Sequence, residues 1–464
     1  MKQEGKWEQG LAVVLLAMFF LFLSGCINSP EQKIIAPQQV TSIIDANKNG
    51  IYSTEINNQR NVAMISDNYF AVASGWRYKI GSAIVGDKYS HAYNVVYYET
   101  KDNGKNWHSV ILAQNNFDNS YPHIVVSKDR KTVAVSWIEI NRENNAAIIK
   151  LRHCKIENDC SKDLSWENPI SFGSFKWAPF NQIVGAIDFD FDGKLHAIFQ
   201  EDGNLVHGII DLDSGTISEK ETVIIGKSIS RQGIIIGKKH IDLTYIKNDR
   251  QLYYKRYDNG SKKWGEDILI NPKQETTWLA TDEFDGTTYF VYTYDNFNPF
   301  TNGQIGGNNY YYKKFSDGKL SEEVEIIKLK EARVANVTAT PNGWFVFFDE
   351  TPRPQIRNPP NSDQNILFAL IKEGEPIKIF ELLMQPKSQT TPASSRFIDD
   401  SNKIIVIYHT QEFNSGTWDT LRSIWVDIYD RKEKELGRTT SLIDIKISNT
   451  QQAIITILER VELI

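Results

Sequence analysis

The residues best suited to bind a ligand lie at the ends of a series of short apolar stretches. Aromatic rings stack on the C–H faces of sugars, and carboxylates accept hydrogen bonds from sugar hydroxyls, although the same groups also suit a cationic or peptide ligand. For any single residue, a local hydrogen bond at the end of its strand is the plainer interpretation. The candidates are Trp76, Arg77, Trp137, Glu139, Glu201, Tyr294, Asp295, Glu350, His409 and Glu412.

Four long segments follow these apolar stretches and are rich in Gly, Asn and aromatic residues. They cover residues 76–92, 295–309, 350–364 and 410–421. Long loops on a compact scaffold commonly carry function, so we expect them to form a recognition surface along one rim. Disordered insertions are the alternative.

Pairs of carboxylates at these ends could hydrolyse a glycosidic bond, with one group as the acid and the other as base or nucleophile. Glu139 or Glu201 could be paired with Glu350 in this way. Such pairs also arise by chance among several carboxylates, so no catalytic residue is assigned. The sequence therefore leaves open whether the protein is an enzyme, and it favours a binding protein over a glycoside hydrolase.

A possible calcium loop lies near the N-terminus. Asp45, Asn47, Asn49 and Glu55 supply oxygen ligands, but Glu55 comes one position earlier than an EF-hand requires, and no flanking helices are expected. A structural calcium ion is therefore one option and an Asn/Gly turn is the other; no cofactor is required. The run DFDFDG at 188–193 is similar, but it is also common as a simple turn before a strand.

The N-terminus has the pattern of an export signal. The apolar run at 11–23 is shorter than the roughly 20 residues of a membrane-spanning helix, and it follows Lys2 and Lys6. It ends in Leu23-Ser24-Gly25-Cys26, which resembles the lipobox of prokaryotic lipoproteins. The resemblance implies a signal peptide at 1–25, a lipidated Cys26 with two or more acyl chains, and a tether to residue 40. An uncleaved anchor is the alternative, and either places the rest of the chain outside the cytoplasmic membrane.

Two further cysteines, Cys154 and Cys160, lie close together in the sequence. An exported protein meets an oxidising compartment, and no third thiol or His-rich spacing suggests zinc, so a local disulfide is expected. Two free thiols are the alternative.

Residues 41–464 are expected to form one all-β domain, because strand-like segments recur with the same order of strands and turns. Seven units spaced by roughly 45 to 65 residues predict a β-propeller of four-stranded antiparallel blades. A composite eighth blade could close the ring, with two strands from each end of the chain, at 40–45, 51–56, 443–449 and 452–459. A seven-bladed ring with looser terminal strands and a six-bladed ring are the alternatives. The second strands of the seven units are predicted at 69–76, 132–139, 195–202, 240–247, 288–295, 344–350 and 404–411.

One turn carries a sharp motif. Thr100-x-Asp102-x-Gly104-x-x-Trp107 resembles the Asp-box, or BNR repeat, of sialidases and related propellers. In that superfamily the box stabilises the turn between the third and fourth strands, on the face away from the active site. The resemblance therefore implies a sialidase-like propeller and gives these four residues a structural role.

The chain departs from the sialidase pattern where catalysis would begin. Sialidases need three arginines, an Asp and a Tyr–Glu pair, and their first arginine lies in an Arg-Ile-Pro stretch. The nearest candidate is Arg77, and neither Ile nor Pro follows it; Arg353 and Arg357 share one loop.

We therefore expect an envelope protein, lipid-anchored and facing outside the cytoplasm, that binds a glycan, peptide or envelope protein at its rim without catalysis. The alternatives are a glycoside hydrolase, sialidase-like or other, and a scaffold of an envelope complex. With 58 acidic and 52 basic residues, the formal charge is −6, and no basic face for nucleic acid is apparent.

Overall fold

The structure is a computed structural model in which the chain divides into two units, Met1–Ile35 and Ala36–Ile464; only the second contains described residues. The described residues are 41–45, 60–79, 91–115, 117–141, 143–176, 185–226, 229–247, 251–272, 276–294, 309–328, 335–350, 365–383, 388–399, 401–411 and 418–427.

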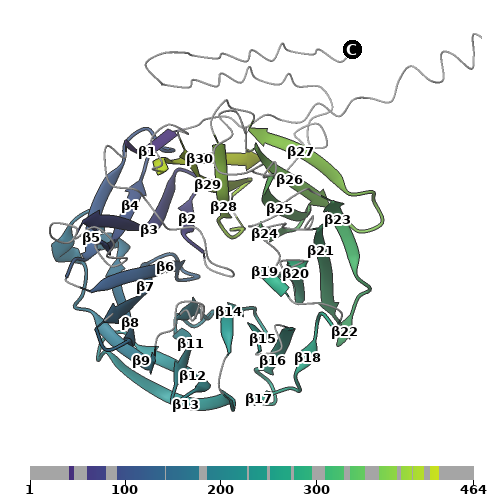
Figure 1. The fold of residues 1–464 in the computed structure, drawn as a ribbon, viewed down its shortest axis with the longest axis horizontal. Helices are drawn as coiled ribbons and strands as arrows, with labels where there is room; N and C mark the ends of the chain where they lie inside the picture. The colour runs from purple at the N-terminus through teal and green to yellow at the C-terminus, as the bar shows by residue number, and fades with distance from the viewer. Residues whose placement is uncertain are drawn as a thin grey trace, which may run out of the picture. The chain divides into compact units, whose positions relative to one another are not determined.

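The described strands form seven antiparallel blades around a central axis, which confirms the predicted all-β propeller (Figure 1). Blade 1 contains β2 (Val62–Ser66), β3 (Tyr69–Lys79), β4 (His91–Thr100) and β5 (His108–Ala113). Blade 2 contains β6 (Asp118–Val126), β7 (Thr132–Asn141), β8 (Ala146–Lys155) and β9 (Ile170–Lys176). Blade 3 contains β10 (Ala186–Phe189), β11 (Leu195–Glu201), β12 (Asn204–Asp211) and β13 (Thr216–Ile224). Blades 2 and 3 are also joined by one parallel pairing, of Glu201 with Ser174.

The next three blades repeat this order. In blades 4 and 5 the outer strand is divided into two short strands. Blade 4 contains β14 (Ser230–Ile236), β15 (His240–Ile246), β16 (Leu252–Asp258), β17 (Lys263–Trp264) and β18 (Ile268–Leu269). Blade 5 contains β19 (Thr276–Phe284), β20 (Thr287–Tyr294), β21 (Asn309–Ser316), β22 (Lys319–Leu320) and β23 (Val324–Lys328). Blade 6 contains β24 (Ala335–Thr340), β25 (Gly343–Glu350), β26 (Asn365–Ile371) and β27 (Lys378–Leu383).

The seventh blade joins the two ends of the chain. Its inner strands are β28 (Ser388–Ser394), β29 (Lys403–Gln411) and β30 (Trp418–Asp427), and its outer strand is β1 (Thr41–Asp45) from the N-terminus. β1 runs antiparallel to β30, with Thr41 opposite Ser423. The closing blade is therefore composite, but it is the seventh and takes one strand from the N-terminal end. The other strands expected near the termini, at 51–56 and beyond 427, lie outside the described residues.

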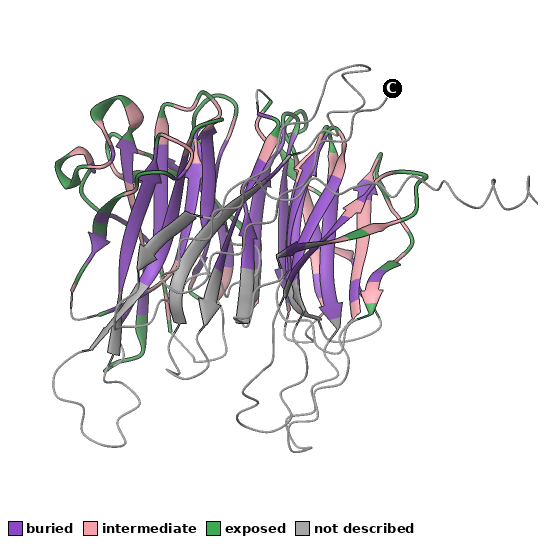
Figure 2. Ribbon diagram, turned by 90° about the horizontal axis from the view of Figure 1, so that it is seen from above, coloured by how far each residue is buried: buried purple, intermediate pink, exposed green. Residues whose placement is uncertain are grey.

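Side chains of the blade faces form the core. Seven clusters of buried apolar residues each lie between two neighbouring blades. The cluster between blades 7 and 1 includes Ile405, Ile407, Val72 and Phe70, so packing as well as strand pairing closes the ring. Each blade is covered on both faces, which is why many strands are continuous apolar runs (Figure 2).

Tight turns follow from their residues. Asp285 and Gly286 have φ of 48° and 82° between β19 and β20, which is the backbone of a type I′ hairpin. Asp202-Gly203 and Asp317-Gly318 have the same pair of positive φ values in two other hairpins. Asp–Gly pairs adopt this conformation with little strain, and they therefore set the register of the paired strands.

The turn after β4 is built by the four residues of the sequence motif. Thr100 Oγ1 donates to Asp102 Oδ1 at 2.8 Å and accepts from the Gly104 N–H at 2.8 Å. Asp102 Oδ1 also accepts from the Asn106 N–H at 2.9 Å, and Gly104 has φ of 78°. Trp107 donates to the Gly104 carbonyl at 3.1 Å and packs edge-on against Phe70.

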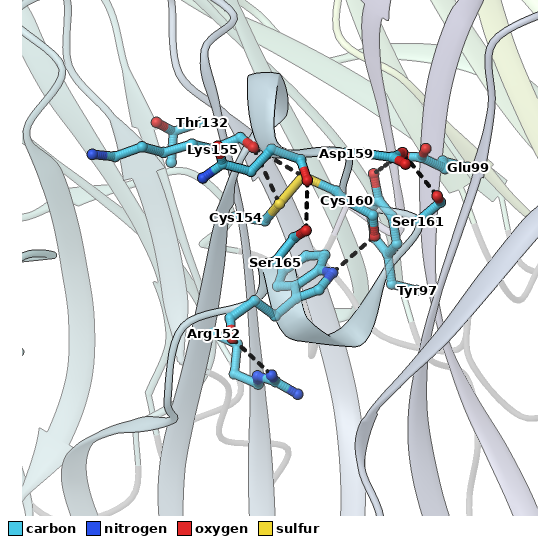
Figure 3. The surroundings of a disulfide bond; sticks show 12 residues. Tyr97, Glu99, Thr132, Arg152, Cys154, Lys155, Asp159, Cys160, Ser161 and Ser165 are labelled. Carbon is cyan, nitrogen blue, oxygen red and sulfur yellow. Dashed lines mark hydrogen bonds between the residues drawn. A yellow bond between two sulfur atoms is a disulfide. The ribbon is translucent and has the colours of Figure 1, made fainter.

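Cys154 and Cys160 are joined by a disulfide, which closes a short loop after β8 (Figure 3). Two short 3-10 helices, Ile156–Asn158 and Asp163–Ser165, lie in this segment. The loop contacts blade 1, because Asp159 accepts from Lys101 Nζ at 2.9 Å. Trp166 packs edge-on against Tyr97, with 4.8 Å between ring centroids. The disulfide therefore fixes a contact between blades 1 and 2.

Candidate functional site

Most of the predicted rim lies outside the residues whose side chains the structure describes. Trp76, Arg77, Tyr294, Glu350 and His409 lie on strands, near the end of the second strand of their blades, where only the backbone is described. Asp295 and Glu412 fall outside the described residues, as do most residues of the four long loops. Their grouping into one binding surface stays a prediction.

The described rim candidates have partners within the protein. Trp137 is 2% exposed and packs in the core between blades 1 and 2, so it is a core residue and presents no ring to a ligand. Glu139 accepts from the Asn115 amide at 2.7 Å and lies 3.8 Å from Lys150 Nζ. Glu201 accepts from Lys220 Nζ at 2.7 Å.

Charged side chains meet at the centre of the ring, and of these only Asp188 was noted from the sequence, as part of the run at 188–193. Arg60 precedes β2 and is 6% exposed. Its guanidinium lies 2.9 Å from Asp282 Oδ1 of blade 5. It also donates to the carbonyls of Thr281, Val337 and Ser394, at 3.1 to 3.3 Å. One side chain of blade 1 is thus bound to blades 5, 6 and 7.

A second arginine connects the remaining blades. Arg396 follows β28 and donates through Nη1 to Asp188 Oδ2 of blade 3 at 2.5 Å. The same oxygen accepts from the Ile236 N–H of blade 4 at 2.8 Å. Lys128 of blade 2 lies 3.9 Å from the other oxygen of Asp188. Arg60, Lys128, Asp188, Asp282 and Arg396 therefore form a network, here called the channel hub, that touches all seven blades.

Burial and mutual attraction set the protonation of the hub. Burial alone would raise the pKa of Asp188, but the charges of Arg396 and Lys128 outweigh it and hold that pKa below its usual range. Burial lowers the pKa of Arg60 to about 10, while Asp282 opposes the shift. Burial and the nearby Arg396 lower the pKa of His123 to about 3, so its ring is neutral at physiological pH. The hub thus brings three basic side chains together with two acidic ones.

The geometry of the hub indicates a structural role for its arginines. Arg60 bonds one carboxylate and three carbonyls, and Arg396 bonds Asp188 and the Ile234 carbonyl. Breaking a buried ion pair leaves an uncompensated charge, so each member holds the others in place. Asp188 and Asp282 are in turn bound by backbone N–H groups, of Ile236 and Ala339.

The sequence carries only a partial signal for the hub. Asp188 and Asp282 stand inside apolar strands, AIDF and TTWLATDEF. A charged residue in such a strand is costly unless it is paired, so a partner could have been expected. Nothing local in the sequence points to Arg60 or Arg396, because both lie far along the chain from the carboxylates that they bind.

The expected calcium loop is described only at Asp45, at the end of β1. Asn47, Asn49 and Glu55 lie outside the described residues. In the second acidic run, Asp190 accepts from the N–H groups of Asp192 and Lys194, which is a turn, while Asp188 belongs to the hub. Within the described ranges, no cluster of three or more His, Cys, Asp or Glu side chains is placed to hold a metal ion.

No helix in the described part of the chain is long and apolar enough to cross a membrane. Cys26 and the apolar run before it lie outside that part.

Comparison with solved structures finds propellers of diverse activity. The K499G mutant of NanB sialidase from Streptococcus pneumoniae is 14% identical, covering 87% of this chain and 73% of that one, with a TM-score of 0.43. The GH93 α-L-arabinofuranosidase of Fusarium graminearum is 15% identical over 82% of this chain and 98% of its own, with a TM-score of 0.43. The β-propeller domain of the Trilobed protease from Pyrococcus furiosus is 10% identical over 83% and 99%, with a TM-score of 0.42.

No protein-family model matches the chain, and no curated protein matches it in sequence. The propeller assignment therefore rests on the strand pairing described above.

Proposed function

We propose that this protein is a lipid-anchored, sialidase-like β-propeller of the cell envelope that binds a glycan, peptide or envelope protein without catalysis. The ligand is held at the rim formed by the loops between second and third strands. Calcium is an optional structural ion of the N-terminal loop. The geometry of the Thr100–Trp107 turn supports assigning it to the Asp-box, with a purely structural role.

The observation that carries the proposal is the channel hub. A propeller hydrolase needs charged groups at the channel that are free to act on a substrate. Here Arg60 and Arg396 are bound to buried aspartates and backbone carbonyls, and Asp188 is held ionised by its cationic neighbours. These contacts give Arg60, Asp188 and Asp282 a role in holding the ring together, and the glycan- or protein-binding surface that we propose is the rim.

The test is binding of the soluble chain, beginning at Ile27, to a broad glycan array with calcium and then with chelator. We expect saturable binding to one class of glycan. Loss of binding in chelator would support a calcium ion and would point to residues 45–55 as its site. Absence of binding in both conditions would exclude a sugar ligand and favour a protein partner.

A pair of variants places the ligand on one face. Glu350→Gln changes the rim end of β25, whereas Glu373→Gln changes the opposite end of the same blade, in the exposed turn after β26. Rim binding predicts weaker binding for the first variant and unchanged binding for the second. The opposite pattern would contradict the proposal.

Lipidation is tested separately. Metabolic labelling with a fatty acid should mark the wild-type chain and leave Cys26→Ala unmarked, with the variant released from the membrane fraction. Equal membrane retention of both forms would instead indicate an uncleaved anchor.

A further inference from the structure

A cavity of about 450 Å³ opens into the channel on the side of the hub away from the predicted rim. Its walls include residues between the first and second strands of several blades, such as Phe191, Lys239 and Asp285, with Met64 of blade 1 and Phe397 of blade 7. The turns on this side of the ring are visible as exposed segments in Figure 2. The volume lies in the range of small-molecule sites, about 300 to 1,000 Å³.

The lining is more cationic than the rest of the chain. Six cationic and five carboxylate side chains line the cavity, whereas the whole chain has 52 basic and 58 acidic residues. The cations are Arg60, Lys128, Arg130, Lys238, Lys239 and Arg396.

The inner carboxylates of the lining already have partners. Asp188 and Asp282 belong to the hub, and Glu283 accepts from the Gly286 N–H at 2.6 Å. Glu283 also lies 3.9 Å from the His240 ring. Asp285 and Asp399 are exposed at the mouth of the cavity.

Two donors in the cavity wall have no close acceptor within the described ranges: Arg396 Nε, which is buried, and the partly exposed ammonium of Lys128. Among the described residues, Lys128 lies 3.9 Å from Asp188 Oδ1, too far for a hydrogen bond, and its ammonium is 5.5 Å from the centre of the Phe191 ring. Arg396 Nε has no hydrogen-bond partner in the described part and lies 3.7 Å from Asp282 Oδ1. Arg396 Nε is removed from water without a described acceptor, which costs free energy that an oxygen anion would recover, and the same anion would lie beside the Lys128 ammonium.

The two donors also lie close to one another. Lys128 approaches one oxygen of Asp188 and Arg396 binds the other, so both stand beside the same carboxylate. Phe397 packs edge-on against Phe284 nearby, which adds an apolar wall. We propose that this cavity binds a small molecule through a carboxylate or phosphate group that accepts hydrogen bonds from Lys128 and Arg396. Phe191 and Phe397 cover the apolar part of the ligand.

This proposal and the rim proposal concern opposite faces of the ring, and neither depends on the other. Glu350→Gln changes the affinity for a ligand at the rim, whereas substitution of Lys128 changes the affinity for a ligand in the cavity.

Isothermal titration of the soluble chain with citrate, and separately with inorganic phosphate, tests the proposal. We expect saturable binding of at least one probe, weakened by at least about tenfold in Lys128→Met because a charged donor is lost. Lys131→Met is the matched control, since Lys131 is exposed on the same turn and outside the cavity, and its affinity should not change. Binding of citrate alone assigns a carboxylate ligand, and binding of phosphate alone a phosphate ligand.

No binding of either probe by the wild type, or equal affinity in Lys128→Met, would overturn the proposal. Should that variant fail to fold, labelling of lysine amines in the wild type with trinitrobenzenesulfonate, which attaches a trinitrophenyl group and releases sulfite, is read out by mass spectrometry instead. Citrate or phosphate should then protect Lys128 and leave Lys131 reactive. Unchanged labelling of Lys128 would equally overturn the proposal.

Discussion

Arg60 is the residue through which the most blades are connected, since it binds Asp282 and three carbonyls of other blades. Arg60→Met keeps much of its length but leaves Asp282 buried with the more distant Arg396 as its cationic neighbour. We expect a loss of about 3 to 5 kcal/mol in the free energy of unfolding, measured by urea denaturation.

The exposed Lys131 gives the control for this loss. Lys131→Met also removes one positive charge, and it should change the free energy of unfolding by no more than about 0.5 kcal/mol. If both variants unfold at the wild-type urea concentration, the hub does not stabilise the ring.

His123 makes the stability depend on pH. Its ring is 2% exposed, and burial together with Arg396 lowers its pKa from 6.5 to about 3. Between these values the unfolded chain binds a proton that the folded chain does not, so stability falls as the pH falls. Between pH 6.5 and 3, the contribution of His123 to the free energy of unfolding falls by about 1.4 kcal/mol for each pH unit of acidification.

Replacing this ring with an apolar side chain tests that account. In His123→Leu, the dependence of the unfolding free energy on pH should flatten by about this slope below pH 6.5. Chemical denaturation at a series of pH values measures it. Identical slopes in the two proteins would show that His123 is protonated in the folded state.

At the residue scale, the sequence allowed only part of the site to be predicted. Asp188 drew attention as part of an acidic run, but its partner Arg396 is distant in the chain. Trp137 was predicted to face a ligand at the rim, but it is buried between blades 1 and 2. An aromatic residue near a strand end can equally face a neighbouring blade. The local sequence pattern predicts that a strand forms, but which face of that strand is buried depends on how the neighbouring blade packs against it.

Single turns are the elements that connect sequence to fold most directly. In the Thr100–Trp107 turn, Thr100 is fully buried and accepts from the N–H of Gly104, which is also buried. Thr100→Val keeps the shape and removes that acceptor, so we expect a loss of about 1 to 3 kcal/mol in thermal or urea unfolding. Thr216→Val, at an exposed position on β13, should have little effect. Equal effects would contradict a structural role for the motif.

The disulfide loop is a second such element. Closing a loop of this length removes chain entropy from the unfolded state that corresponds to about 2 kcal/mol. Reductant should therefore lower the free energy of unfolding of the wild type by about this amount. It should leave the double variant Cys154→Ser, Cys160→Ser unchanged. A wild type insensitive to reductant would mean that the bond does not form in the protein.

The short elements were predictable because their signals are local. Asp–Gly pairs, the Thr100–Trp107 motif and the spacing of two cysteines all act within a few residues. The outer strands of blades 4 and 5 were harder, because each is broken into two short pieces with few apolar residues.

At the scale of the whole molecule, the ring is closed by β1, a strand from the N-terminal end of the chain that pairs with β30 near the C-terminal end. β1 covers the outer edge of β30, which would otherwise present unpaired N–H and C=O groups. A form that begins at Asn47 lacks β1, and we expect it to unfold at lower temperature and to self-associate. Calorimetry and size-exclusion chromatography against a form that begins at Ile27 measure both effects. A monomeric truncated form of full stability would contradict closure by β1.

The number of blades and their closure could not both be deduced from the sequence. Seven repeats are visible because each contains an apolar second strand, of 7 to 11 residues. The partner of β30 is set by pairing between the chain ends, for which a local pattern contains no signal. Composite closure was expected, and only the structure assigns one N-terminal strand to the seventh blade.

The central claim is that the protein binds at its rim and leaves its ligand intact. The most direct measurement is a glycan array that is bound by the soluble chain, incubated for hours, washed free of protein and probed again. We predict saturable binding that returns at full strength in the second round. Binding that decays with incubation and cannot be restored would show that the glycan has been cleaved, and it would contradict the account.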